Sequence, residues 1–311
     1  MATLLEIARQ PVMPHNGSFS GHETFPFRYA WLKKGMDALL RQPDIFNRDD
    51  AMVTLGVGKN MVRAIRHWCL ATQLIAEGDF YPNTRSKVLV PTVIGRALLV
   101  YPAWDAYLED DGSLWLLHWL LANNPERATT WFWAFNILKE QEFTRDSLNT
   151  ALEHMRDDHK YRISDASLKN DASCFMRTYV SAKRGPTSTI EETLDCPLTN
   201  LGLIVDLGDN RYRYNTGPKP GLADEVFTFA LLDFWDHWHP GQETLSLREI
   251  TYGVGSPGSI FKLDDDAVLG YLDEIATTTG GKLSFSDTVM LRQVVRHDTL
   301  VKEDILNAYY A

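Results

Sequence analysis

The span between residues 49 and 95 constrains the fold more than any other part of the chain, because helical and strand-like patterns alternate in it within a few residues. Paired aspartates can cap a short helix at 51–55, and a Gly-Val-Gly turn separates it from a longer helix expected from 59 to about 74. Two short strands at 75–81 and 87–90 follow, and a Thr-x-x-Gly sequence then starts another helix. This order is typical of a winged helix-turn-helix, whose second helix enters the major groove of DNA.

The longer helix of this span is amphipathic. Met61, Val62, Ile65 and Trp68 share one face at helical spacing, so we expect them to pack in the core. The opposite face is polar, and guanidinium and amide groups there can pair with guanine and adenine edges. We expect contacts with double-stranded DNA from Lys59, Asn60, Arg63, Arg66 and His67 on this helix and from Arg85 and Lys87 on the hairpin. The alternatives are an ordinary solvated helix and a protein-interaction module.

The charge of the chain is uneven along its length. The net charge is -10 at pH 7, yet residues 19–100 hold 11 basic against 7 acidic side chains. Residues 221–311 hold 6 basic against 15 acidic ones. A surface that binds phosphate therefore belongs mainly in the first third, whereas the acidic last third would be repelled by DNA and suits a protein partner.

The length of 311 residues predicts two or three compact units, and the pattern of elements predicts a mainly α protein with small β-hairpins, an α+β class. We expect tandem winged helix-turn-helix-like domains. The expected segments are an N-terminal arm at 1–18, a winged helix-turn-helix domain at 19–100, a helical middle domain with a β-hairpin at 101–216, and an acidic helix-turn-helix-like domain at 222–311. The Gly- and Pro-rich run at 215–221 is the best candidate linker.

A second hairpin is expected near residue 210, where Arg211-Tyr212-Arg213-Tyr214 alternates charge and ring. Its basic face, formed by Arg211 and Arg213, could be a second wing that touches DNA. The tryptophans of the middle third recur at helical spacing, which is typical of a core helix and not of a base-stacking platform.

Several short patterns look catalytic or metal-binding, but each lacks the structural context that the corresponding motif requires. The run 253–258 matches G-x-G-x-x-G as text but follows a helix, and Asp158-His159-Lys160 lies at a helix end without a paired carboxylate. His237 and His239 are two residues apart and lack a third ligand. We therefore expect no catalytic residue, no metal and no cofactor. His22 and Glu23 do not fit the H-E-x-x-H zinc motif, and they stay candidates for a functional loop.

The chain has no apolar run of the roughly 18 residues needed to cross a bilayer, and its start lacks a secretory signal. Three scattered cysteines form no disulfide framework. The expectation is a cytoplasmic protein without a membrane partner.

Two segments resemble a known bacterial family. They are 20–35, which begins Ser-Gly-His-Glu-Thr-Phe-Pro-Phe-Arg-Tyr, and 53–69, which contains Gly-Val-Gly-Lys-Asn-Met-Val. Both are similar to the DUF4007 proteins, a poorly characterised family found beside genes for sulfur handling and DNA phosphorothioation and in phage-defence islands. The resemblance implies a DNA-related accessory role and supplies no catalytic residues.

Together these inferences predict a DNA-binding accessory component of a bacterial DNA-modification system of the phosphorothioation type, or of a phage-defence system. The alternative is an adaptor that uses winged-helix domains to assemble such a complex with other proteins, in part through the acidic C-terminal domain. A nuclease is the third reading, and we expect that the chain is not an enzyme.

Overall fold

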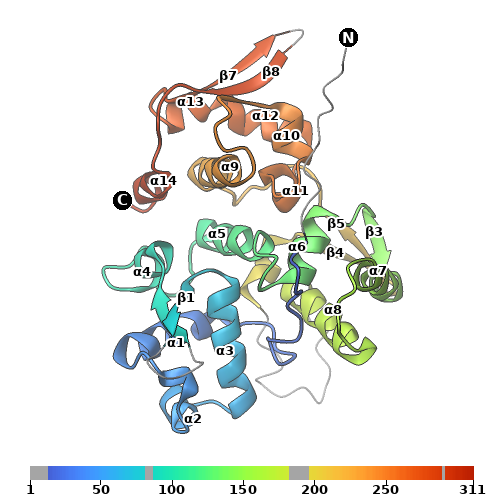
Figure 1. Ribbon diagram of the computed structural model, residues 1–311. Coiled ribbons are helices and arrows are strands. Elements are labelled where there is room, and N and C mark those ends of the chain that lie inside the picture. The colour runs from blue at the N-terminus through green and yellow to red at the C-terminus, as the bar shows by residue number, and fades with distance from the viewer. Residues whose placement is uncertain (1–12, 81–86, 182–195, 289–290) are drawn as a thin grey trace.

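The computed structural model describes residues 13–80, 87–181, 196–288 and 291–311 (Figure 1). Helices dominate it, and three small antiparallel sheets accompany them, so the α+β class is confirmed. Within the described ranges, no helix combines the length and the apolar character that a membrane span requires.

The N-terminal part contains the predicted order of helix, turn, helix and hairpin. Its elements are α1 (Tyr29–Arg41), the 3-10 helix η1 (Ile45–Asn47), α2 (Ala51–Leu55), α3 (Lys59–Ala71), β1 (Ile75–Phe80), β2 (Lys87–Pro91) and α4 (Val93–Leu99). Gly56 ends α2 in the left-handed conformation, with φ of 61°, which glycine adopts without steric cost. The Thr92 side chain caps α4 by accepting a hydrogen bond from Gly95 N at 3.0 Å. A Cβ at Gly95 would lie 1.9 Å from Leu74 O, so only glycine fits where α4 approaches the backbone just before β1.

The middle part is built around a second sheet. Its elements are α5 (Asp111–Ala122), α6 (Thr129–Asn136), β3 (Glu142–Thr144), α7 (Arg145–Asp158), α8 (Asp165–Tyr179), the 3-10 helix η2 (Pro197–Leu201), β4 (Ile204–Gly208) and β5 (Arg211–Tyr214). The hairpin of β4 and β5 is as predicted, and β3, which the sequence pattern did not predict, extends it in the order β3-β5-β4. Thr144 and Ser164 cap α7 and α8 by accepting hydrogen bonds from backbone N–H groups.

The C-terminal part repeats that arrangement. Its elements are α9 (Asp224–Trp238), β6 (Thr244–Ser246), α10 (Leu247–Tyr252), α11 (Pro257–Phe261), α12 (Asp265–Asp273), α13 (Ile275–Thr278), β7 (Leu283–Thr288), β8 (Leu291–Arg296) and α14 (Lys302–Tyr309). The order β6-β8-β7 matches that of the middle sheet. Asp264 caps α12, because its side chain accepts a hydrogen bond from Ala267 N at 2.9 Å. The final helix α14, which was not predicted, packs beside α9 (Figure 1).

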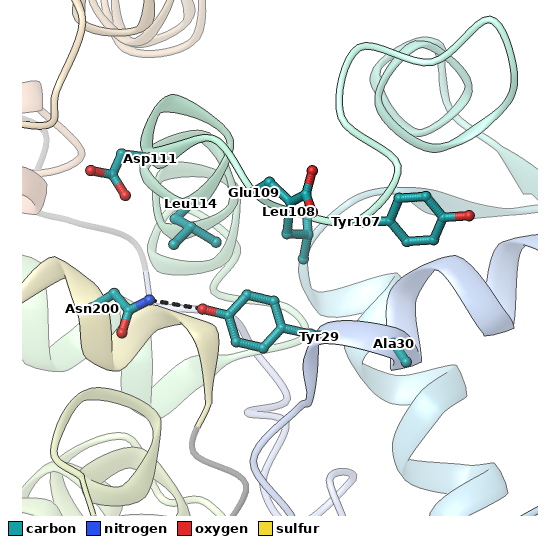
Figure 2. Close-up of a pocket in the computed structure, with 8 residues that line it drawn as sticks. All are labelled: Tyr29, Ala30, Tyr107, Leu108, Glu109, Asp111, Leu114 and Asn200. Atoms are coloured by element: carbon teal, nitrogen blue, oxygen red, sulfur yellow. Dashed lines mark hydrogen bonds between the residues drawn. The ribbon is translucent and has the colours of Figure 1, made fainter.

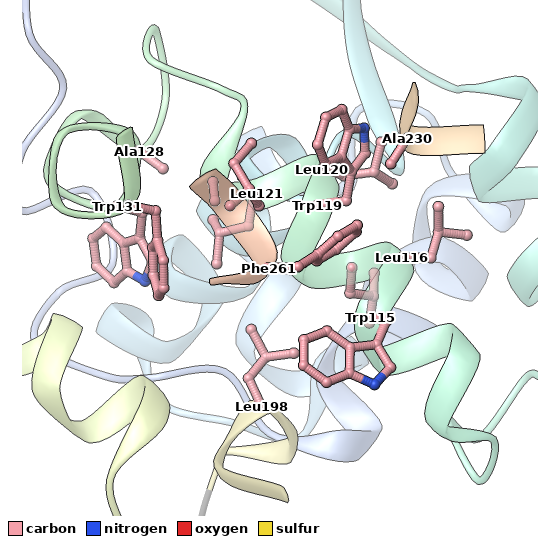
Figure 3. Close-up of a cluster of buried hydrophobic side chains, with 14 of the residues drawn as sticks. Trp115, Leu116, Trp119, Leu120, Leu121, Ala128, Trp131, Leu198, Ala230 and Phe261 are labelled. Atoms are coloured by element: carbon pink, nitrogen blue, oxygen red, sulfur yellow. The ribbon is translucent and has the colours of Figure 1, made fainter. Parts of the chain in front are cut away.

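The core runs through all three parts, with α5 at its centre. Every residue of α5 from 112 to 122 is buried, so this helix is apolar all round. The ring of Phe261, from α11, packs against two tryptophans of α5 (Figure 3). The distance between ring centroids is 5.7 Å to Trp115 and 5.6 Å to Trp119. Buried tryptophans cannot stack on nucleic-acid bases, so the reading of this helix as core is confirmed.

The candidate linker at 215–221 is fixed to the C-terminal part. Lys219 is buried, and its Nζ donates hydrogen bonds to Asn215 O at 2.8 Å, Gly217 O at 2.6 Å and Lys262 O at 3.2 Å. Burial lowers the pKa of Lys219 to about 8. Residues 222–311 therefore pack directly on the rest of the chain, while the domain boundaries stay a prediction.

Candidate nucleic-acid interface

The helix α3 divides into a buried and an exposed face much as its spacing predicts. Val62 and Ile65 are buried, whereas Lys59, Asn60 and Arg63 are exposed on the first turns. The helix begins directly after Gly58, so the N–H groups of its first turn have no hydrogen-bond partner within the helix. The exposed turns offer donors to an anion or to base edges.

His67 does not belong to this exposed face, and its expected contact with DNA is wrong. Its ring is buried, and a Cβ added at Gly21 would lie 2.5 Å from its Nδ1, so the backbone at Gly21 covers it. Burial is the main cause that lowers its pKa to about 3, and the neighbouring cations Arg127 and Arg66 add to it. His67 is therefore a neutral core residue that cannot reach a groove.

The loop that covers His67, residues 20–25, makes hydrogen bonds with both α3 and α8. His22 is buried, and its Nδ1 accepts a hydrogen bond from Thr24 N at 3.0 Å, so its Nε2 carries the proton and donates to Asp171 Oδ1 at 2.6 Å. Trp68 Nε1 donates to Phe25 O at 2.8 Å from the α3 side, and the Arg177 guanidinium donates to Thr24 O from the α8 side. The structure thus places His22 in a structural contact between two helices.

The same loop carries backbone strain. Ser20, Glu23 and Thr24 have φ values of 60°, 50° and 68°, a conformation that non-glycine residues adopt at a cost of about 1–3 kcal/mol each. The strained turn directs Glu23 toward α3, where its Oε1 lies 3.4 Å from Arg63 Nη1. Arg63 remains 56% exposed, so this ion pair leaves the guanidinium open to solvent.

Three cations gather around one carboxylate at the base of the β1–β2 hairpin. Glu77 lies 3.3 Å from Arg66 Nη2, 3.1 Å from Lys87 Nζ and 2.7 Å from Arg127 Nη2. Burial acts to raise the pKa of Glu77, but the hydrogen bond from Lys87 and the charges of Arg127 and Arg66 outweigh it and lower the pKa. We call these four residues the Glu77 cluster. It carries two more positive than negative charges.

The remaining predicted contacts are placed in part. Arg85 lies outside the described residues, whereas Lys87 begins β2 as a member of the Glu77 cluster. Arg211 and Arg213 are exposed on β5, while Tyr212 and Tyr214 are buried, so the predicted alternation of faces is confirmed. The strand β5 that holds them pairs with β3, which contacts α7, and this sheet lies apart from α3 (Figure 1).

Sequence reasoning missed Arg127, which lies between α5 and α6, some sixty residues after α3. The loop is fixed because Asn124 Nδ2 donates to Leu70 O at 3.3 Å and to Ala71 O at 3.0 Å, two carbonyls at the C-terminal end of α3. No local pattern around Arg127 indicates this contact, since it depends on how α5 packs beside α3.

A cavity of about 540 Å³ is lined by residues of α1, α5, η2 and the segment before α5, and by none of α3 (Figure 2). Tyr29, Tyr107, Glu109 and Asp111 line it together with Asn200, whose Nδ2 donates to Tyr29 Oη at 2.8 Å. Among its described lining residues there is no Lys or Arg, and two are carboxylates, so this cavity does not fit a phosphate group.

Metal ligands are not grouped in the part of the chain that the structure describes. No three or more His, Cys, Asp or Glu side chains there lie close enough to hold a metal ion. Asp158 and His159 lie exposed at the end of α7, and His237 and His239 lie at the end of α9. The described residues do not fit a metal centre with three protein ligands.

Comparison with known proteins places the chain among relatives of the same fold. It is 32% identical to a crystal structure of magnesium ion-bound SspB, with a TM-score of 0.83 over 94% of this chain and 88% of that one. A second SspB crystal structure is 31% identical, also with a TM-score of 0.83, over 95% of this chain and 89% of that one. None of the curated proteins matches. The model of the family described as Protein of unknown function (DUF4007) matches residues 19–310. The chain therefore belongs to the DUF4007 family.

Proposed function

We propose that this protein is a DNA-binding accessory component of a bacterial DNA-modification system of the phosphorothioation type, or of a phage-defence system. It binds double-stranded DNA through α3 and the β1–β2 hairpin. The observation that carries the proposal is the exposed row Lys59, Asn60 and Arg63, which lies on the same helix as Arg66 of the Glu77 cluster. Bidentate base contacts by Arg and Asn, with flanking phosphate contacts, are the means by which such helices read a groove.

The element order supports a winged helix-turn-helix for residues 51–91. The helix α2, the turn at Gly56, the helix α3 and the hairpin follow one another with short connections, as this motif requires. The middle part places a strand and two α-helices, and the C-terminal part a strand and four α-helices, before a hairpin whose second strand pairs with that first strand. We infer that they are further winged-helix-like units, which makes the chain a tandem array.

In the proposed complex the β1–β2 hairpin, the wing of the motif, contacts phosphate. The first turns of α3 face base edges. Lys87 is available for the phosphate contact at the base of the hairpin. Arg211 and Arg213 belong to a different sheet, so a contact between them and DNA would need a second binding surface. On that sheet Arg213 Nη1 lies 3.8 Å from the carboxylate of Glu142, which offsets part of the positive charge there.

The test is binding of the full chain to a labelled duplex of about 25 base pairs, measured by fluorescence anisotropy over several salt concentrations. A second duplex with sulfur in its backbone tests whether the modification is sensed. We expect affinity to fall linearly with salt on logarithmic axes, because each phosphate contact releases about 0.9 counterion. Absence of binding to both duplexes at low salt would contradict the proposal.

An adaptor function is the second candidate, and the charge of α12 favours it. Asp265, Asp266 and Asp273 are exposed on this helix, and such a surface repels DNA and can attract a basic protein surface. An adaptor that does not bind DNA would form a stoichiometric complex with another protein of the same system and show no salt-dependent duplex binding.

We propose no catalytic function, and a nuclease is the outcome that would overturn this. One similar structure, SspB, holds a magnesium ion, so plasmid cleavage should be tested with that metal. We expect supercoiled and phosphorothioated plasmids to stay uncut with magnesium or manganese. Cleavage that copurifies with the protein and is lost in Asp158→Ala or Asp264→Ala would assign an active site to that carboxylate.

A further inference from the structure

The Glu77 cluster joins residues from three separate stretches of the chain. Arg66 comes from α3, Lys87 from the β1–β2 hairpin and Arg127 from the loop that follows α5. Each places a cationic nitrogen within 3.3 Å of Glu77, so the three side chains converge on one point. Isolated surface arginines and lysines do not converge in this way, because holding long side chains together costs rotamer entropy.

Within the Glu77 cluster, the side chain of the carboxylate is less exposed to solvent than the side chains of the three cations. Glu77 is 17% exposed, whereas Arg66, Lys87 and Arg127 are 35%, 42% and 36% exposed. The carboxylate therefore lies deeper than the cationic groups that it attracts. One negative charge cannot neutralise three positive ones, and two positive charges remain on the side that faces solvent.

The surroundings of the cluster are firmly held. Asn124 fixes the Arg127 loop to the carbonyls at the end of α3, and Gln73 Nε2 donates to Leu120 O of α5 at 2.7 Å. A cavity of about 410 Å³ opens beside the cluster, and Arg127 and Lys302 line it together with the carboxylates Glu77, Asp233 and Glu303. Arg66 and Lys87 are not among its lining residues, so an anion would meet the three cations at their solvent-exposed ends and not inside this cavity. Cations that are already ordered and partly exposed can accept an oxyanion with little rearrangement.

We propose that Arg66, Lys87 and Arg127 form a preorganised subsite for one phosphate group of a nucleic-acid backbone, and that Glu77 is the residue that positions them. The subsite rests on the proposed DNA binding and extends it, because it recruits Arg127 from outside the winged helix-turn-helix. It also gives α3 a fixed depth in the groove, since a phosphate held beside Arg66 sets the distance of the helix from the backbone.

The test compares the wild-type chain with Arg127→Ala, with Arg127→Lys and with Arg292→Ala. Arg292 is the matched control, because it is an exposed arginine paired with one carboxylate, that of Asp287 at 2.9 Å, on the distant β7–β8 hairpin. Duplex affinity is measured against salt. In parallel, the thermal midpoint of each protein is measured with inorganic phosphate against chloride at equal ionic strength, because a bound anion stabilises the folded state.

We expect Arg127→Ala to weaken duplex binding about fivefold to tenfold near 0.1 M salt and to reduce the salt slope by about 0.9, the value for one lost phosphate contact. Arg127→Lys keeps the charge and should retain most of the slope, and Arg292→Ala should match the wild type. Phosphate should raise the thermal midpoint of the wild type and not that of Arg127→Ala.

Two different failures can be told apart. If the wild type binds the duplex while Arg127→Ala keeps its full affinity and slope, the subsite is wrong and the proposed function stands. If phosphate stabilises the wild type through Arg127 but no duplex binds, the subsite stands and the proposed function is wrong. If phosphate has no effect and no duplex binds, both are wrong.

Discussion

At the scale of single residues, the structure separates polar side chains that look alike in the sequence. Arg63 and His67 are four residues apart on one helix, yet Arg63 is exposed and His67 lies under the backbone of Gly21. The spacing of four residues puts both on neighbouring positions of a helix surface, so only a contact from outside the helix could distinguish them. The strained loop at 20–25 supplies that contact.

Gly21→Ala tests this close approach. The added Cβ would lie 2.5 Å from His67 Nδ1, so the ring or the loop must shift, and we expect a loss of about 1–3 kcal/mol in the free energy of unfolding. Gly270→Ala is the control, because its Cβ meets no atom within 4 Å and it lies inside α12, where alanine is favoured. Urea denaturation measures both variants, and an unchanged Gly21→Ala midpoint would show that the loop does not cover His67.

Two buried histidines predict how stability depends on pH. Burial is the largest cause that lowers the pKa of His67 and of His118 to about 3, whereas both take up protons near pH 6.5 when unfolded. Between these values the unfolded state binds more protons, so stability is present above pH 6.5 and is lost as the pH falls. Urea denaturation should show a loss of about 2–3 kcal/mol between pH 7.5 and 5.5. A flat profile over this range would mean that the two rings are not buried as neutral groups.

At the scale of elements, sequence patterns located most helices and missed the strands that depend on distant partners. The Gly-Val-Gly turn that begins at Gly56 is a local signal, and it is confirmed. The strands β3 and β6 have three residues each and form only because β5 and β8 are beside them. The helix α5 is capped by Asp110, whose side chain accepts a hydrogen bond from Gly112 N at 2.7 Å.

The candidate interface was predicted in the same uneven way. Lys59, Asn60 and Arg63 follow from the amphipathic pattern of a single helix, which local spacing defines completely. Glu77 and Arg127 do not, because their contact depends on the packing of α5 beside α3. One part of the surface that we propose for DNA thus follows from the local pattern of a single helix, and the other part depends on tertiary packing.

At the scale of the whole molecule, the acidic C-terminal part shares its core with the rest of the chain. His118 of α5 bridges Tyr179 Oη at 2.9 Å and Ile260 O at 2.9 Å, so one buried side chain joins the middle and C-terminal parts. At the end of the chain, Tyr309 Oη donates to Asp110 Oδ1 at 2.7 Å, and the Tyr310 ring stacks on Trp104. The C-terminal part thus differs from the N-terminal part in net charge, although the two belong to one packed structure.

Removal of residues 222–311 should therefore unfold the remainder. The truncation removes α9 and α11, which pack on α5, together with α14, and it exposes Trp115 and Trp119. The loss of this burial is comparable with the ~5–15 kcal/mol of stability that a typical domain has. We expect the shortened chain to aggregate or to lose its cooperative thermal transition, as followed by circular dichroism and light scattering. A monomeric fragment with a cooperative transition would establish residues 1–221 as an independent unit.

The central claim is that the exposed face of α3 contacts DNA, and the double variant Arg63→Ala/Arg66→Ala tests it most directly. Fluorescence anisotropy with one duplex at several salt concentrations compares it with the wild type and with Arg292→Ala. If both arginines contact phosphate or base edges, the double variant binds at least tenfold more weakly near 0.1 M salt, and its salt slope falls by about 1.8 if both contacts are to phosphate. Equal affinity and equal slope for the folded double variant and the wild type would contradict the account, because the reader of DNA would then lie elsewhere.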